Sequence, residues 1–268
     1  MEDKYIDLLL NKCVDLESGI LFIHYNKEIK KFIEKLSNKA KNIGIKEIYL
    51  EEFDPYYNHD ILLNSTTNEI ENNKYFDSSI WDLYAKKNAS FLIFETEYPH
   101  MLDDIEPAKI GLSARLRRNS RPIYRKMVEN CTLSWCIAAY PSKTWADDLF
   151  DTSDNYNELL NFIYKICMVD RENPIAAWDE QLNKNNKVIK NLNDLTIEKL
   201  HYKNSLGTDL TIFLPTNYLF SSAKDSKVIV NMPSYEVFTS PIYNKTEGIV
   251  YSSMPLNYNG GIIDEFYL

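Results

Sequence analysis

The sequence predicts an α/β protein with a mostly parallel sheet and flanking helices, followed by a β-rich domain. In the first part, short apolar runs alternate with stretches whose apolar residues recur every three or four positions. This is the pattern of strands that alternate with helices. Later, helical spacing gives way to short runs separated by Asn, Gly and Pro turns. We therefore predict an N-terminal α/β domain over residues 1–193 and a β-rich domain over residues 194–268.

The first elements form a βαβ unit. Apolar residues at helical spacing predict a helix over 3–16, and the apolar run 19–24 predicts a buried strand. Residues 27–43 again show helical spacing, and the run 45–50 predicts a second strand. Two strands joined through a helix are parallel and connected with a right-handed crossover by default.

The alternation continues after the second strand. Residues 78–87 predict a helix and residues 91–94 a strand. A long helix is expected over 107–128, broken before Pro122, and a fourth strand over 133–139. Three more helices are predicted over 146–150, 156–168 and 174–192.

The last part contains short alternating or apolar runs typical of strands. These runs cover residues 210–214, 228–230, 249–253 and 261–268. The apolar end of the chain fits a terminal strand, and it also fits an edge left by a truncated chain.

Composition narrows the classes of function. The 268 residues carry a net charge of −9, which argues against a nucleic-acid partner. No window approaches the roughly eighteen uncharged apolar residues of a membrane span, and the acidic start lacks a signal pattern. We therefore expect a cytoplasmic protein without a membrane partner. One basic cluster runs against the net charge, and we interpret it as a solvated helix face pairing with nearby acids. Holding a peptide carboxylate or a partner chain is the alternative for these residues, Arg115, Arg117, Arg118, Arg121, Arg125 and Lys126.

Three acidic residues are candidates for chemistry. Glu236 stands alone between a proline turn and an apolar pair, after the run 227–230. A carboxylate in such a loop is either a turn residue bonded to backbone or a ligand for Zn²⁺ or Mn²⁺. Asp209 either bonds the turn backbone or orients a metal ligand. Glu247 is either a surface carboxylate or a contact for a substrate amine.

Other familiar sites are missing from the sequence. The loop after His24 has no glycine, which removes the dinucleotide fingerprint and the phosphate-cradling loop. We interpret His24 as a structural histidine. The chain contains no His-Glu-x-x-His motif and no Gly-x-Ser-x-Gly element.

Three segments together resemble the thermophilic-type metallo-aminopeptidases, the family of aminopeptidase T and aminopeptidase S. Their order and rough spacing match, so the resemblance covers nearly the whole chain. The third segment is the most specific, and Gly-Thr-Asp-Leu is moderately specific. The segments are Pro141-Ser142-Lys143-Thr144-Trp145-Ala146, then Gly207-Thr208-Asp209-Leu210-Thr211 with Leu214-Pro215, then Asn231-Met232-Pro233-Ser234 and Glu236 to Pro241 with Glu247-Gly248.

The resemblance implies a metal-dependent aminopeptidase that hydrolyses the N-terminal residues of peptides. It implies two divalent ions (Zn, Co or Mn) that bind the scissile carbonyl and activate water. Family members often carry two adjacent acids in the third segment. Here Tyr235 stands at the first position, so Glu236 is the expected metal ligand. A homodimer built through the later domain is implied for the full-length protein.

Length is the departure from the family. Its members continue past the matched region, and their other ligands, a second glutamate, two histidines and an aspartate, lie there. We therefore expect no catalytic residue within this chain, which would be an amino-terminal portion that is inactive alone. The rival hypothesis is a non-catalytic α/β binding or interaction module.

Overall fold

The computed structural model describes residues 1–222, 228–258 and 261–267. The chain forms two compact units. The first contains residues 1–179 and a later segment that ends at Ser234, and the second contains the stretch from Glu180 and the chain from Tyr235 onward. The predicted boundary between residues 193 and 194 stays a prediction. In the described part, no helix is long and apolar enough to cross a membrane.

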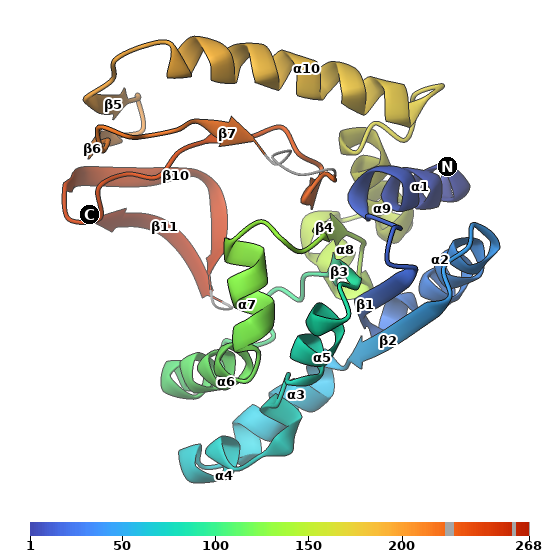
Figure 1. The fold of residues 1–268 in the computed structure, drawn as a ribbon. Coiled ribbons are helices and arrows are strands. Elements are labelled where there is room, and N and C mark those ends of the chain that lie inside the picture. The colour runs from blue at the N-terminus through green and yellow to red at the C-terminus, as the bar shows by residue number, and fades with distance from the viewer. Residues whose placement is uncertain (223–227, 259–260, 268) are drawn as a thin grey trace. The chain divides into compact units, whose positions relative to one another are not determined.

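A parallel five-stranded sheet with the order β2-β1-β3-β4-β8 forms the centre of the first unit (Figure 1). Its ladders are parallel throughout, which confirms the predicted α/β class. The order reverses between β1 and β3, so this sheet has a topological switch point there. The strands are β1 (Ile20–Asn26), β2 (Glu47–Phe53), β3 (Ser90–Glu95), β4 (Trp135–Ala139) and β8 (Asn231–Met232).

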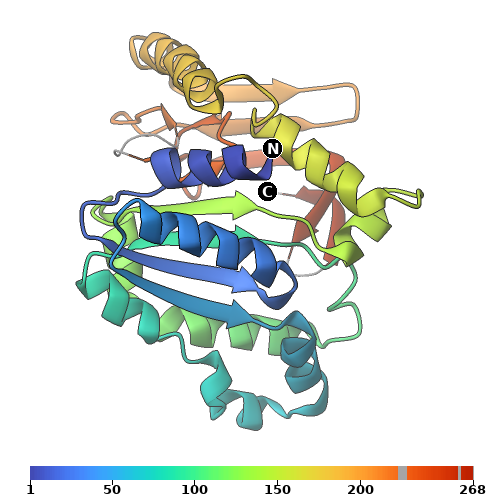
Figure 2. The ribbon, with the colours of Figure 1, turned by 90° about the vertical axis from the view of Figure 1, so that its right-hand side faces the viewer.

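Helices pack on both faces of this sheet (Figure 2). Alternate residues of a strand point to opposite faces. On one face, α1 (Glu2–Leu8) meets α2 (Lys30–Asn42), where Tyr5 stacks on Phe32 at 6.1 Å between ring centroids. On the other face, Phe22 packs at 5.0 Å from Trp81, which α5 (Ile80–Lys86) carries.

The predicted helix over 107–128 is two helices, with the break at Arg121 and Pro122 as expected. They are α6 (Pro107–Asn119) and α7 (Pro122–Glu129). The sequence reading missed α3 (Pro55–Asn64) and α4 (Thr67–Glu71), although Asp54 and Thr66 are N-cap residues that signal both. The other helices of this unit are η1 (Leu9–Cys13), η2 (Lys27–Ile29), η3 (Lys74–Phe76), α8 (Lys143–Leu149), α9 (Asn155–Ile166) and the start of α10 (Pro174–Asn193).

The predicted strand 228–230 differs from the structure. The ladder residues are the next two, Asn231 and Met232 of β8, which pair in parallel with Ile137 and Ala138 of β4. Val230 still takes part, because its carbonyl oxygen accepts a hydrogen bond from Ile137 N at 2.9 Å. The segment therefore completes the parallel sheet of the first unit.

Antiparallel sheets form the second unit, which confirms its β-rich character. The larger sheet has the order β11-β10-β6-β5, and β7 pairs with β9 in a separate ladder. The rest of α10 also belongs to this unit. The strands are β5 (Lys199–Lys203), β6 (Asp209–Phe213), β7 (Ser221–Ser222), β9 (Val237–Phe238), β10 (Thr246–Tyr258) and β11 (Gly261–Tyr267).

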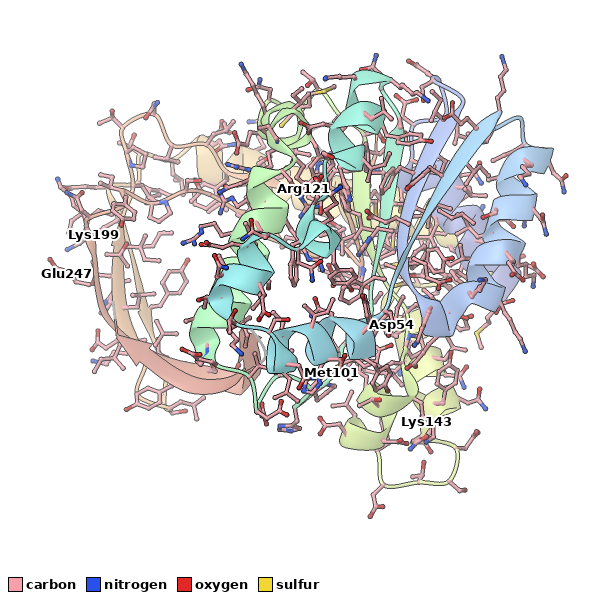
Figure 3. All side chains as sticks on the ribbon, turned by 90° about the horizontal axis from the view of Figure 1, so that it is seen from below. Asp54, Met101, Arg121, Lys143, Lys199 and Glu247 are labelled. Carbon is pink, nitrogen blue, oxygen red and sulfur yellow. The ribbon has the colours of Figure 1, made fainter. Side chains whose placement is uncertain are left out.

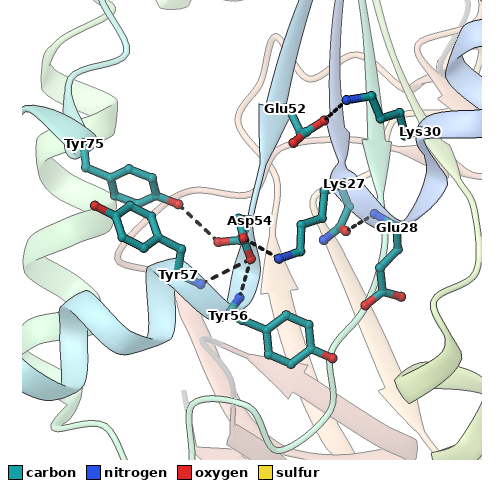
Figure 4. A network of polar contacts seen from close by, with 9 residues as sticks. Lys27, Glu28, Lys30, Glu52, Asp54, Tyr56, Tyr57 and Tyr75 are labelled. Atoms are coloured by element: carbon teal, nitrogen blue, oxygen red, sulfur yellow. Dashed lines mark hydrogen bonds and ion pairs between the residues drawn. The ribbon is translucent and has the colours of Figure 1, made fainter.

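Asp54 joins the end of β2 to α3 (Figure 4). Its carboxylate accepts hydrogen bonds from the backbone amides of Tyr56 (3.1 Å) and Tyr57 (3.2 Å) and from Lys27 Nζ. Burial opposes ionisation of this carboxyl. The Lys27 hydrogen bond and the two amides outweigh it and hold the pKa of Asp54 below its ordinary value. Folding therefore favours the ionised form.

We predict that Asp54→Ala lowers the free energy of unfolding by about 0.5–2 kcal/mol, the range for loss of an N-cap. Asp54→Asn keeps a capping oxygen and should cost less. Because the folded pKa of Asp54 is lowered, its ionisation contributes stability above the ordinary pKa, and this is lost as the pH falls through the folded value. Urea unfolding at neutral and acidic pH tests this, and equal losses in both variants would contradict the capping role.

Candidate functional site

The segment Pro141 to Ala146 starts a helix after β4. Ser142 is fully buried, and its Oγ accepts a hydrogen bond from Trp145 N at 2.9 Å while donating to the carbonyl oxygen of Glu97 at 2.7 Å. This is an N-cap, and Ala146 packs in the core behind it. The pattern is therefore explained by the start of α8.

The Gly-Thr-Asp segment closes the turn between β5 and β6. Asn204 bonds the turn backbone, since its Oδ1 accepts from Leu206 N (3.0 Å) and Thr208 N (3.2 Å). Gly207 has a φ of +108°, and a Cβ there would lie 2.9 Å from the ring of Tyr251. Thr208 ties the turn to β10, because its Oγ1 accepts from Tyr251 N at 3.0 Å. One alternative for Asp209 was a bond to the turn backbone. Asn204 makes such bonds in this turn.

Asp209 pairs instead with two basic side chains of β5. His201 Nε2 lies 2.7 Å from Oδ1, and Lys203 Nζ donates to Oδ2 at 2.9 Å. The hydrogen bonds from His201 and then Lys203 lower the pKa of the Asp209 carboxyl. All three side chains are at least half exposed, so this is a surface network with little net stabilisation. Its role behind a metal ligand stays a prediction.

Glu247 is exposed on β10, directly opposite Thr211 of β6. Thr211 is in turn opposite His201, and Asp209 is opposite Lys203. Side chains opposite each other in a ladder share a face, and so do residues two apart along a strand. The structure thus brings Asp209 and Glu247 to one face of the antiparallel sheet, together with His201 and Lys203.

Glu236 lies just before β9 in the second unit and is half-buried. A partly buried carboxylate offers hard oxygen donors that suit a divalent ion. In the described part of the chain, however, no group of three or more His, Cys, Asp or Glu side chains could hold a metal ion. Glu236 can contribute one ligand, and the described residues do not make a complete donor set with it.

The basic cluster is not uniformly solvated, which corrects our interpretation for two of its members. Arg117 is half-buried, with its guanidinium 4.7 Å from the ring centre of Tyr75 and hydrogen bonds to the carbonyl oxygen of Tyr75 (3.3 Å) and to Asn58 Oδ1 (3.2 Å). Arg121 lies over the ring of Trp81 at 4.2 Å. Arg125 does pair with a nearby acid as expected, since its Nη2 lies 3.6 Å from Glu129 Oε1.

Both inward-turned arginines line a cavity of about 580 Å³ in the first unit. His24 also lines it and is paired, with Nδ1 2.7 Å from Glu51 Oε2. Sequence reasoning placed His24 at a strand end but missed the cavity, because the other walls come from distant strands and from α5, α6 and α7.

Comparison with known proteins identifies the family. A family described as thermophilic metalloprotease (M29) matches residues 2–268. The chain belongs to this M29 family. The resemblance inferred from the three segments is therefore confirmed.

Relatives of this M29 chain carry aminopeptidase names. Aminopeptidase PepS of Streptococcus thermophilus is 28% identical over 272 residues, which cover 98% of this chain and 66% of the relative. Aminopeptidase 2 of Geobacillus stearothermophilus is 26% identical, with 99% and 66% covered. Wild-type AmpT from Thermus thermophilus shares the fold with a TM-score of 0.80 and 21% identity, over 98% of this chain and 66% of that one. The chain thus spans about two thirds of the length of these relatives.

We predict that Gly248→Ala destabilises the second unit more than Gly207→Ala does. Gly248 has a φ of +131°, and a Cβ there would lie 2.1 Å from the backbone oxygen of Asp209. The strained backbone alone costs about 1–3 kcal/mol, and the clash with a ladder carbonyl adds to it. At Gly207 the obstacle is the movable ring of Tyr251. Hydrogen exchange of the β6 and β10 amides measures the effect, and equal protection in both variants would contradict it.

Proposed function

We propose that this chain forms part of a metal-dependent aminopeptidase that releases N-terminal residues from peptides. The observation that carries the proposal is the M29 family match over residues 2–268. The aminopeptidase names of the relatives support it, since PepS and aminopeptidase 2 match nearly the whole of this chain. Family membership favours this function over a non-catalytic binding or interaction module.

Within this proposal, Glu236 supplies one oxygen ligand to a site for two divalent ions, Zn, Co or Mn. Two observations support this role: Glu236 belongs to the third segment, and it is half-buried just before β9. When bound, the ions would lower the pKa of a water molecule and stabilise the charge that develops on the substrate carbonyl. Asp209 and Glu247, on one face of the antiparallel sheet, are candidates for orienting a ligand and for contacting the substrate amine.

We also propose that the 268 residues hydrolyse nothing by themselves and bind Zn²⁺ or Co²⁺ weakly. Glu236 is the single ligand assigned here, and a hydrolytic zinc site uses three protein ligands. The cytoplasmic location, the homodimer and the lack of nucleic-acid partners stay predictions.

The purified 268-residue polypeptide tests this. We expect no release of leucine from a leucine p-nitroanilide probe after addition of Zn²⁺ or Co²⁺. Isothermal titration of Co²⁺ should show weak binding that Glu236→Gln weakens further. Hydrolysis that co-purifies with the polypeptide and disappears with a chelator would contradict the inactivity.

The product of the whole open reading frame tests the enzyme itself. We expect metal-dependent hydrolysis there and a loss of at least about 100-fold in kcat with Glu236→Gln. Changes behind a ligand already cost 10–100-fold, and Glu236 would touch the metal directly. Glu198→Gln, an exposed acid of the same unit, is the matched control and should leave kcat unchanged. Full activity of the Glu236→Gln protein with unchanged metal content would rule out its role as a ligand.

A further inference from the structure

The cavity of the first unit has the features of a ligand site. At about 580 Å³ it is within the usual range of small-molecule pockets. Its walls include His24 of β1, Glu51 of β2 and Ile93 of β3, so it lies beside the switch point between β1 and β3. Open α/β sheets bind ligands at such a point.

One side of the cavity is a fixed polar frame. Glu51 accepts hydrogen bonds from Trp81 Nε1 at 3.0 Å and 2.8 Å through its two carboxylate oxygens, and His24 Nδ1 lies 2.7 Å from Oε2. These bonds occupy the carboxylate and hold the indole ring in place. Phe91 stacks on both the Trp81 ring and Phe22, and the ring of Phe22 packs against Trp81 at a tilt. The face of the Trp81 ring that lines the cavity is therefore a rigid surface.

Arg121 lies on this surface, at the junction of α6 and α7 (Figure 3). Its guanidinium is 4.2 Å from the ring centre of Trp81 and 5.6 Å from that of Tyr124. Nε is buried and has no hydrogen-bond partner among the described residues. Arg117 differs, since the carbonyl of Tyr75 and the side chain of Asn58 engage it.

A half-buried guanidinium without a direct ion pair is unfavourable, because burial removes water from the charge. Burial lowers the pKa of Arg121 accordingly, and Tyr124 and then Glu51 oppose this through space. Of the three other acids of the wall, Glu95 is exposed at the end of β3, and two are engaged elsewhere. Glu52 bonds Tyr25 Oη and Lys30, and Asp77 accepts from the amide of Ser79. The planar fork of arginine suits a carboxylate in this position.

The rest of the lining is largely apolar and selects the body of the ligand. Phe53, Val128, Trp135 and Ile137 contribute to the same cavity. A ligand cation cannot stack on this ring face of Trp81, because Arg121 already covers it. In the loop after β1, the backbone amide of Glu28 is not available to a phosphate, since Asn26 Oδ1 accepts from it at 2.9 Å.

We propose that this cavity binds a small carboxylate with an aromatic or branched apolar body, and that Arg121 pairs with the carboxylate. All residues that line this site belong to the first unit, and Glu236 is not one of them. It does not rest on the proposed aminopeptidase activity, and its test measures binding without hydrolysis.

The probe is 3-phenylpropionate, titrated into the 268-residue protein by isothermal calorimetry. We expect saturable binding to one site, and binding of the uncharged 3-phenylpropionamide about ten- to hundredfold weaker, the range for loss of a charged hydrogen bond. Arg121→Gln should weaken the binding of 3-phenylpropionate by a similar factor. Arg118→Gln, an exposed residue of α6 with the same change of charge, is the matched control and should not alter binding.

Indole N–H signals in an NMR spectrum locate the probe. Those of Trp81 and Trp135, which line the cavity, should shift, and those of Trp145 and Trp178 should stay. If Arg121→Gln proves unfolded by circular dichroism, Arg121→Lys replaces it, and the loss of the planar fork should still weaken binding. No saturable binding, equal binding of the amide, inorganic phosphate binding as tightly, or unchanged affinity in the folded variant would each overturn the proposal.

Discussion

The course of the later chain depends on backbone hydrogen bonds that attach the segment around β8 to the first unit. Ile137 N donates to the carbonyl oxygen of Val230, and Ile229 N donates to that of Lys12 at 2.8 Å. The first of these bonds and the β8 ladder cover the edge of β4, which would otherwise expose unpaired amides and carbonyls. The second bond attaches the segment to η1. These bonds also determine where the third segment begins, since Glu236 follows a few residues after β8.

The three segments shared with the family have different physical origins. Ser142 starts a helix, and Gly207 and Thr208 close a turn against Tyr251. Folding therefore suffices to explain these residues. Gly248 belongs with them, because the backbone of Asp209 leaves no room for a side chain there. Glu236 is different, since it is a half-buried carboxylate outside the regular elements. Its role as a metal ligand stays a prediction.

The two units carry separate candidate sites built on different principles. In the first, aromatic stacking beneath Trp81 and the bonds of Glu51 make a rigid surface, and one guanidinium on it lacks a protein partner for its Nε among the described residues. In the second, Asp209 is held by exposed partners that water screens. A charge is a stronger indication of binding where burial prevents water from solvating it.

The sequence by itself determined the α/β class, the helix break at Pro122, the β-rich later part and the family, because local periodicity, turn residues and short segments carry these directly. It did not determine that residues 231–232 join the parallel sheet, because strand partners far apart in the chain leave no local pattern. Nor did it separate Arg117 and Arg121 from their solvated neighbours. Tertiary packing decided that, since the aromatic rings that receive them come from α5, α7 and η3.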